Sequence, residues 1–231
     1  MIRFGTEYGG YLLPENINLN SESIIYSLGI GEDISFDTTL SGKYNCKISM
    51  FDPTPRSIEH VNKIKNFLNN KEELPNNKRY GGGQSDYLDI IKKSGCNPIH
   101  LIFEPIGIYN KDDFLDFYFP NNDEYVSCSL ETYERNSNKS IKVQVKTIET
   151  IMKEKNHSKI DVMKIDIENS EYDVLMNMFD CNIFPNFICI DFDGIRNNYL
   201  NNEKKILILE RILQKYTVLV NNNYDFTFSL K

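Results

Sequence analysis

The sequence predicts an α/β fold built on a mostly parallel sheet, and two patterns in the chain lead to this prediction. Short apolar runs bounded by Gly, Pro, Asp and Asn have the length and composition of buried parallel strands. Amphipathic segments of helical period separate these runs, and such alternation builds βαβ units with right-handed crossovers. The chain has 231 residues, so we expect residues 1–231 to form a single domain.

The order of the expected elements can be followed along the chain. Strands are expected at 24–28, 47–51, 99–103, 161–165 and 187–190. Helices are expected at 57–68, 86–93, 147–155, 170–179 and 203–215. The tail, 216–220 followed by 225–230, predicts a terminal antiparallel hairpin across an Asn-rich turn.

The stretch from about 109 to 146 interrupts this alternation. It contains a dense aromatic cluster, followed by β-like runs at 125–130 and 140–145. We interpret it as a small β insert at one end of the sheet. Because aromatic faces suit sugar rings and other flat ligands, the insert is also a candidate contributor to a substrate site.

Composition narrows the classes of function. The net charge is −7 and the chain has no basic stripe, which argues against a nucleic-acid binder that must neutralise phosphates. The five cysteines lack zinc-site spacing and indicate reduced thiols. No apolar stretch suits a signal peptide or a membrane span. We therefore expect a cytoplasmic protein that acts on a small molecule or a glycan, without nucleic acid or membrane.

The first candidate ligand site follows the apolar run 24–28, since ligands of open α/β sheets bind at the carboxyl ends of strands. Gly29 and Gly31 allow the backbone to approach a ligand closely, and acids and a serine come next, at Glu32, Asp33 and Ser35. A dinucleotide fingerprint needs a third glycine that this loop lacks, and acids repel a pyrophosphate. The loop favours a ligand that carries an amino group and a sulfonium, although a glycine pair alone is also typical of a structural turn.

Asp52 and Pro53 follow the next apolar run, and Asp52 comes 21 residues after Gly31. A carboxylate at this place can accept both hydroxyls of an adenosine ribose, whereas its alternative role is to start the turn before the proline. The spacing from the glycine loop favours ribose binding. After the third run, Ile106 and Gly107 form an apolar turn suited to flank an adenine ring.

Carboxylates follow the fourth and fifth apolar runs. They are Asp166 and Glu168 after the fourth run, and Asp191 and Asp193 after the fifth. Neighbouring strand ends would bring them into one region. Such a group repels itself unless one carboxyl is protonated or a cation is present.

Three motifs, in order, resemble the FkbM-type methyltransferase family: YSLGIGEDISFD, then FDPTP at 51–55, then DVMKIDIENSEYDVL at 161–175. The upstream YGGYLLP at 8–14 is similar to a glycine–tyrosine segment common in that family. The resemblance covers nearly the whole chain. It implies a Rossmann-like class I methyltransferase fold with a seven-stranded sheet, S-adenosylmethionine as cofactor, and a sugar or natural-product hydroxyl as acceptor.

The resemblance also implies roles for individual residues. Gly29, Gly31 and Glu32 would line the methionine side of the cofactor, and Asp166 and Glu168 would face the methyl-transfer site. The full set expected to bind cofactor is Gly29, Gly31, Glu32, Asp33, Ser35, Asp52, Pro53, Ile106, Gly107 and Asp166. Two departures are Asn169, where the family commonly has Gly, and Phe192 with Asp193, where an acid is often followed by His.

A sugar hydroxyl needs help to lose its proton, and two mechanisms remain open. Either Asp166 or Glu168 acts as the base, or one of the two, with Asp166 preferred, joins Asp191 and Asp193 in holding Mg²⁺. Alternative functions are methylation of another small molecule, a lipid or a protein, an NAD-dependent enzyme, and a non-catalytic nucleoside-binding module attached to a glycosyltransferase. The chain could equally belong to a larger glycan-synthesising protein or complex.

Two further features are interpreted as structural. His60 is expected on the surface of a helix, and neither it nor the other two histidines, His100 and His157, follows the carboxyl end of a strand. The glycine loop at 80–84 is interpreted as a plain connector between helices, with a lid over the cofactor as the alternative.

Overall fold

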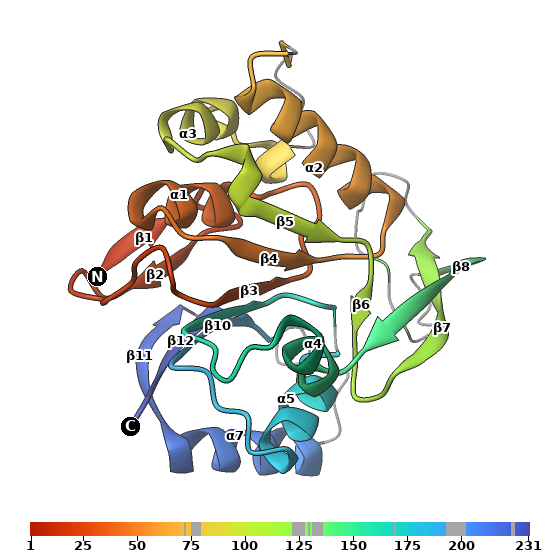
Figure 1. The fold of residues 1–231 in the computed structure, drawn as a ribbon. Coiled ribbons are helices and arrows are strands. Elements are labelled where there is room, and N and C mark those ends of the chain that lie inside the picture. The colour runs from red at the N-terminus through yellow and green to blue at the C-terminus, as the bar shows by residue number, and fades with distance from the viewer. Residues whose placement is uncertain are drawn as a thin grey trace. The chain divides into compact units, whose positions relative to one another are not determined.

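The structure is a computed structural model that describes residues 1–71, 73–74, 80–121, 128, 130, 136–168, 170–192, 202–222 and 225–231. Contacts within the chain divide it into two compact units, Met1–Pro105 and Ile106–Lys231. Figure 1 colours the first from red to yellow-green and the second from green to blue. The single domain expected over 1–231 stays a prediction.

The first unit contains three parallel strands in the order β3–β4–β5. These are β3 (Ile25–Leu28), β4 (Ile48–Phe51) and β5 (Leu101–Glu104). Every residue of β3 and β4 is buried, as expected for apolar strands covered on both faces. A short antiparallel pair, β1 (Ile2–Phe4) and β2 (Tyr11–Leu13), precedes them, and the sequence patterns did not predict it.

Helices of the first unit follow these strands. They are α1 (Ser35–Tyr44), α2 (Pro55–Leu68) and α3 (Tyr87–Lys93), with short 3₁₀ helices η1 (Tyr80–Gly83) and η2 (Pro98–His100). A proline at the first position of α2 suits a helix start, because an N–H at that position would have no acceptor within the helix. In Figure 1, α1 lies beside β1, and the two elements are in contact.

The second unit contains four strands in the order β11–β12–β10–β9. These are β9 (Val162–Ile165), β10 (Phe187–Asp191), β11 (Tyr216–Asn222) and β12 (Asp225–Leu230). The β9–β10 pair is parallel, whereas β12 is antiparallel to both β10 and β11. The expected terminal hairpin is therefore confirmed, and an α/β fold with a mixed sheet is shown. The complete seven-stranded Rossmann-like arrangement stays a prediction.

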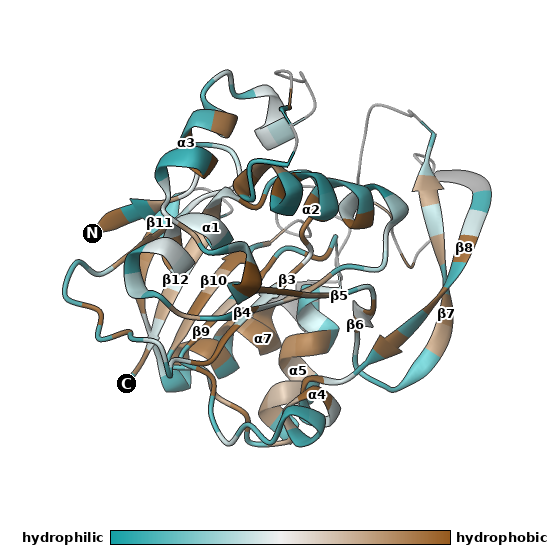
Figure 2. Ribbon diagram, turned by 45° about the horizontal axis from the view of Figure 1, so that its top comes forward, coloured by the Kyte–Doolittle hydropathy of each residue, from teal (hydrophilic) through white to brown (hydrophobic). Residues whose placement is uncertain are grey.

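Helices α4 (Ile148–Lys155), α5 (Glu171–Asp180) and α7 (Asn202–Lys215) accompany these strands. On α7, Ile208 and Ile212 are buried, whereas Ile206 and Leu213 are about half exposed. In Figure 2, hydrophobic residues colour β9 and β10 brown, whereas hydrophilic residues cover much of α2 in teal. Among the helices of the described residues, none combines the length and the apolar character needed to cross a bilayer.

The β insert is a three-stranded sheet in the order β6–β8–β7. Its strands are β6 (Gly107–Ile108), β7 (Asp113–Pro120) and β8 (Asn136–Lys146). The aromatic cluster forms β7 itself, which the sequence patterns did not assign to a strand. The strand expected at 125–130 falls mostly outside the described residues.

Candidate functional site

The loop after β3 has the backbone geometry that its two glycines predict. Gly29 has a φ of 72° and Gly31 a φ of 55°, both in the left-handed region. The Gly29 N–H donates to the carbonyl of Phe51 at 3.0 Å, which ties the loop to the end of β4. A Cβ placed on Gly31 would meet no heavy atom of the described residues within 4 Å. The backbone at Gly31 therefore faces open space that a ligand can enter.

Asp52 braces this loop. One carboxylate oxygen, Oδ2, accepts from the N–H groups of Ile30 and Gly31, both at 2.9 Å. The other, Oδ1, accepts from the Thr54 N–H at 2.8 Å and the Thr54 hydroxyl at 2.6 Å. A carboxylate has about four lone-pair directions, so protein groups occupy all of them. A ribose hydroxyl would have to share or replace one of these bonds, and ribose binding by Asp52 stays a prediction. The adjacent Pro53 is half-buried.

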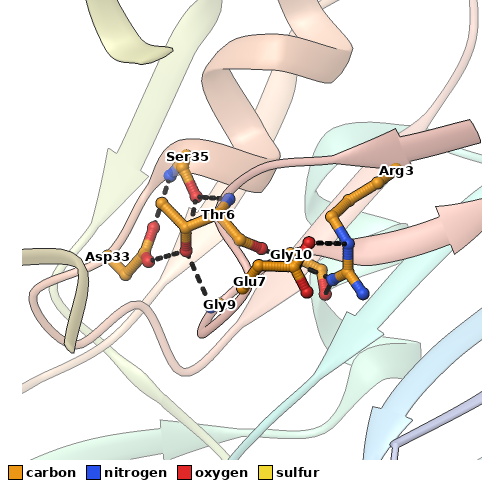
Figure 3. Close-up of polar contacts among 7 residues, drawn as sticks. All are labelled: Arg3, Thr6, Glu7, Gly9, Gly10, Asp33 and Ser35. Carbon is orange, nitrogen blue, oxygen red and sulfur yellow. Dashed lines mark hydrogen bonds and ion pairs between the residues drawn. The ribbon is translucent and has the colours of Figure 1, made fainter. Parts of the chain in front are cut away.

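Asp33 and Ser35 of the loop bind the N-terminal segment (Figure 3). The Asp33 carboxylate accepts from the Thr6 hydroxyl at 2.7 Å and from the Ser35 N–H at 2.7 Å. The Ser35 hydroxyl accepts from the Thr6 N–H at 2.8 Å. Asp33 and Ser35 are buried, at 7% and 0% exposure. Their established contacts are therefore structural, and a direct contact with cofactor stays a prediction.

Glu32 forms an ion pair with Arg56, at the start of α2. The two side chains are 11% and 25% exposed, so the pair lies at the edge of the protein surface. The carbonyl of Glu32 also accepts from the Gly81 N–H at 3.0 Å. The glycine loop at 80–84, expected to be a plain connector, is thus docked through η1 on the candidate cofactor loop.

A buried polar pair, Tyr87 and His60, supports the same loop at the start of α1, and the sequence patterns did not predict it. The Tyr87 hydroxyl accepts from the Ile34 N–H at 3.1 Å and lies 2.8 Å from His60 Nε2. Ile34 is the N-cap of α1 and has no capping side chain of its own, so the tyrosine takes that role. The surface position expected for His60 is wrong, since the side chain is 1% exposed. Burial lowers the pKa of His60 to about 3 and raises that of Tyr87.

The acidic pair of the second unit follows β9. The Asp166 side chain is 40% exposed, and its Oδ2 lies 3.8 Å from the ammonium of Lys164, which is 3% exposed. Glu168 has a φ of 51°, unusual for a residue with a Cβ. Glu171, fully buried at the start of α5, accepts from the Ile167 N–H at 3.1 Å and closes this loop. Asn169, which stands where the family commonly has Gly, lies outside the described residues.

The proposed magnesium ligands are only partly described. Asp191 ends β10 opposite Asp225 of β12, and Asp193 lies outside the described residues. Within the described ranges, no group of three or more His, Cys, Asp or Glu side chains is arranged to hold a metal ion. The Lys164 ammonium also offsets the charge of Asp166, which makes that carboxylate less suited to a second cation. Because Asp193 lies outside the described residues, a magnesium site at Asp166, Asp191 and Asp193 stays a prediction.

Two remaining predicted residues open the second unit. Ile106 is half-buried, and Gly107 is buried at the start of β6, where it pairs with Val145 of β8. Their role beside adenine stays a prediction. A groove of about 520 Å³ lies elsewhere, in the first unit, and none of its lining residues was predicted to bind a ligand: Phe67, Leu68, Asn70, Lys71, Glu73, Lys92, Gly95 and Cys96.

Comparisons with known proteins bear on the function. No curated protein matches the chain. The crystal structure of an rRNA methylase from Streptococcus thermophilus is similar over 92% of this chain and 90% of that chain, with 12% sequence identity and a TM-score of 0.39. The family model described as the methyltransferase FkbM domain matches residues 13–211. Because these residues make up most of its length, the chain belongs to the FkbM methyltransferase family.

Proposed function

We propose that the protein is an S-adenosylmethionine-dependent O-methyltransferase that acts on a hydroxyl group of a sugar or glycan. Membership of the FkbM family supports methyl transfer in general. The observation that carries the choice of cofactor is the loop after β3, where the backbone at Gly31 faces open space.

The residues around this loop fit the proposed cofactor. Positive φ angles at Gly29 and Gly31 turn the backbone sharply, and the lack of a side chain at Gly31 leaves room for close approach. Asp33 places negative charge beside the loop, which suits the ammonium and sulfonium groups of S-adenosylmethionine and repels a pyrophosphate, whereas Arg56 offsets the charge of Glu32. When bound, this cofactor supplies an electrophilic methyl group.

The second unit supplies the proposed base. Methyl transfer to oxygen is an in-line displacement, so the protein must align the acceptor and accept the proton that its hydroxyl loses. Asp166 follows the carboxyl end of β9, and its 40% exposure leaves the carboxylate accessible to an acceptor. We assign the proton to Asp166, with Glu168 as the second candidate. We propose this mechanism without a metal, because the Lys164 ammonium already lies beside Asp166.

The β insert supports a sugar as the acceptor. The register pairs Phe114 with Gln144 and Asp116 with Lys142, so one face of the ribbon carries these four side chains. Phe114 is 59% exposed and the other three are also exposed. An aromatic face beside polar groups matches the apolar faces and hydroxyl edges of a sugar ring.

The test is transfer of a labelled methyl group from S-adenosylmethionine onto a panel of sugars and glycans. We expect product with at least one glycan, and a loss of about 10² to 10⁴ in kcat for Asp166→Asn or Glu168→Gln, whichever removes the base. Transfer only to lipid, protein or another small molecule would contradict the proposed acceptor. Near-normal turnover in both variants would contradict the carboxylate base, and activity that EDTA abolishes would contradict the metal-free mechanism.

A further inference from the structure

The N-terminal turn at 6–10 is pinned to the candidate cofactor loop. The Thr6 hydroxyl donates to the Asp33 carboxylate and accepts from the Gly9 N–H at 2.9 Å (Figure 3). The Gly10 N–H donates to the Thr6 carbonyl at 3.1 Å, which closes the turn. A Cβ on Gly9 would lie 2.7 Å from the Asp33 carboxylate, so the turn packs directly on this acid. The position of Tyr8, within the turn, is therefore set by the loop.

The aromatic ring of Tyr8 lies on a second glycine segment. A Cβ on Gly82 would come within 2.3 to 2.5 Å of three ring carbons of Tyr8, which places the ring against the backbone of η1. The neighbouring Gly81 N–H donates to the Glu32 carbonyl. Tyr8 nevertheless remains 67% exposed, so much of its ring is accessible to a ligand.

Contacts thus link three segments that are distant in sequence: the turn at 6–10, the loop at 29–35 and the 3₁₀ segment at 80–83. All three belong to the first unit. We propose that Tyr8 forms a wall of the cofactor site and covers the methionine arm of S-adenosylmethionine. This inference rests on the proposed function, because it assumes that the Gly31 loop binds that cofactor.

The choice of the methionine arm follows from chemistry. That arm carries the sulfonium and the ammonium, and the face of an aromatic ring attracts cations. Asp33, whose carboxylate accepts from Thr6 of the turn, adds negative charge beside the loop. A cationic arm is therefore the part of the cofactor that this side of the loop would stabilise.

The experiment measures binding of two ligands by calorimetry. S-adenosylhomocysteine carries the amino-acid arm, whereas 5′-methylthioadenosine lacks it. We expect Tyr8→Ala to weaken the binding of S-adenosylhomocysteine about tenfold and to leave the affinity for 5′-methylthioadenosine unchanged. Ile99→Ala, which removes another exposed apolar side chain of the first unit, is the control and should change neither affinity. Equal weakening of both ligands, or of neither, would overturn the assignment to the arm.

A second variant moves the ring without removing it. Gly82→Ala places a methyl group against Tyr8, so we expect it to weaken the binding of S-adenosylhomocysteine as Tyr8→Ala does. The double variant should bind this ligand no more weakly than either single variant. Additive losses would contradict an effect through the ring. If the unaltered protein bound neither ligand, the proposed function would fail. Binding by the unaltered protein that Tyr8→Ala leaves intact would overturn the role of Tyr8 alone.

Discussion

Replacement of Asp52 by Asn distinguishes a structural brace from a ligand-binding group. In the structure, the Asp52 carboxylate accepts four hydrogen bonds, two at each oxygen. The amide of Asn keeps one accepting oxygen and presents an N–H₂ group to the donors on the other side. A hydrogen bond to a charged group contributes about 1.5 to 3 kcal/mol, so the loss of two predicts a fall of about 3 to 6 kcal/mol in the free energy of unfolding.

Urea unfolding followed by far-ultraviolet circular dichroism measures this change, since the chain has no tryptophan to report by fluorescence. Asp112→Asn is a matched control. Asp112 accepts from the Thr147 N–H and the Thr150 hydroxyl, at 2.8 and 2.7 Å, but it is exposed, so we expect its loss to cost under about 1 kcal/mol. A similarly small change for Asp52→Asn, together with lost cofactor affinity, would refute the brace and favour direct ribose binding.

Two further predictions concern stability. Burial holds the folded pKa of His60 at about 3, below its ordinary value of 6.5, so the unfolded chain binds the extra proton between these values. The contribution of the neutral His60 to the free energy of unfolding is complete above about pH 6.5 and is lost as the pH falls towards 3. Urea titrations should therefore show a flatter pH dependence of this free energy for His60→Gln than for the unaltered protein. Equal slopes would contradict the buried neutral imidazole. Glu168 has a φ of 51°, which glycine adopts more readily than alanine. In thermal unfolding, Glu168→Gly should therefore be more stable than Glu168→Ala by about 1 kcal/mol. Both variants lose the same side-chain contacts, so the comparison isolates the backbone. A more stable Ala variant would contradict the left-handed backbone.

The regular elements were predictable where the chain carries a simple pattern. The runs at 24–28, 161–165 and 187–190 became β3, β9 and β10 within a residue or two, because short, mostly apolar runs are typical of buried parallel strands. The terminal hairpin followed from its turn composition. The short β1–β2 pair and the strand β7 were missed, since three-residue strands and aromatic clusters have no distinctive period.

The candidate site was predictable in its residue positions but less so in their contacts. The glycines and acids of the loop could be placed because ligand loops follow strand ends. Sequence could not show that Asp33 binds Thr6, 27 residues earlier, or that Tyr87 caps α1 for Ile34, 53 residues earlier. Such bonds depend on the tertiary packing of distant segments, and one buried histidine looks the same in sequence as an exposed one.

The central claim is that the Gly31 loop binds S-adenosylmethionine, and calorimetry of S-adenosylhomocysteine binding tests it most directly. Gly31→Ala adds a methyl group where the protein leaves open space, at a folding cost of about 1 kcal/mol for its positive φ. Gly95→Ala is the matched control, because Gly95 has a φ of 69° and similarly open surroundings. We predict that the unaltered protein and Gly95→Ala bind the ligand equally and that Gly31→Ala binds at least about tenfold more weakly. The absence of binding to the unaltered protein, or equal affinity for the two variants, would contradict the account.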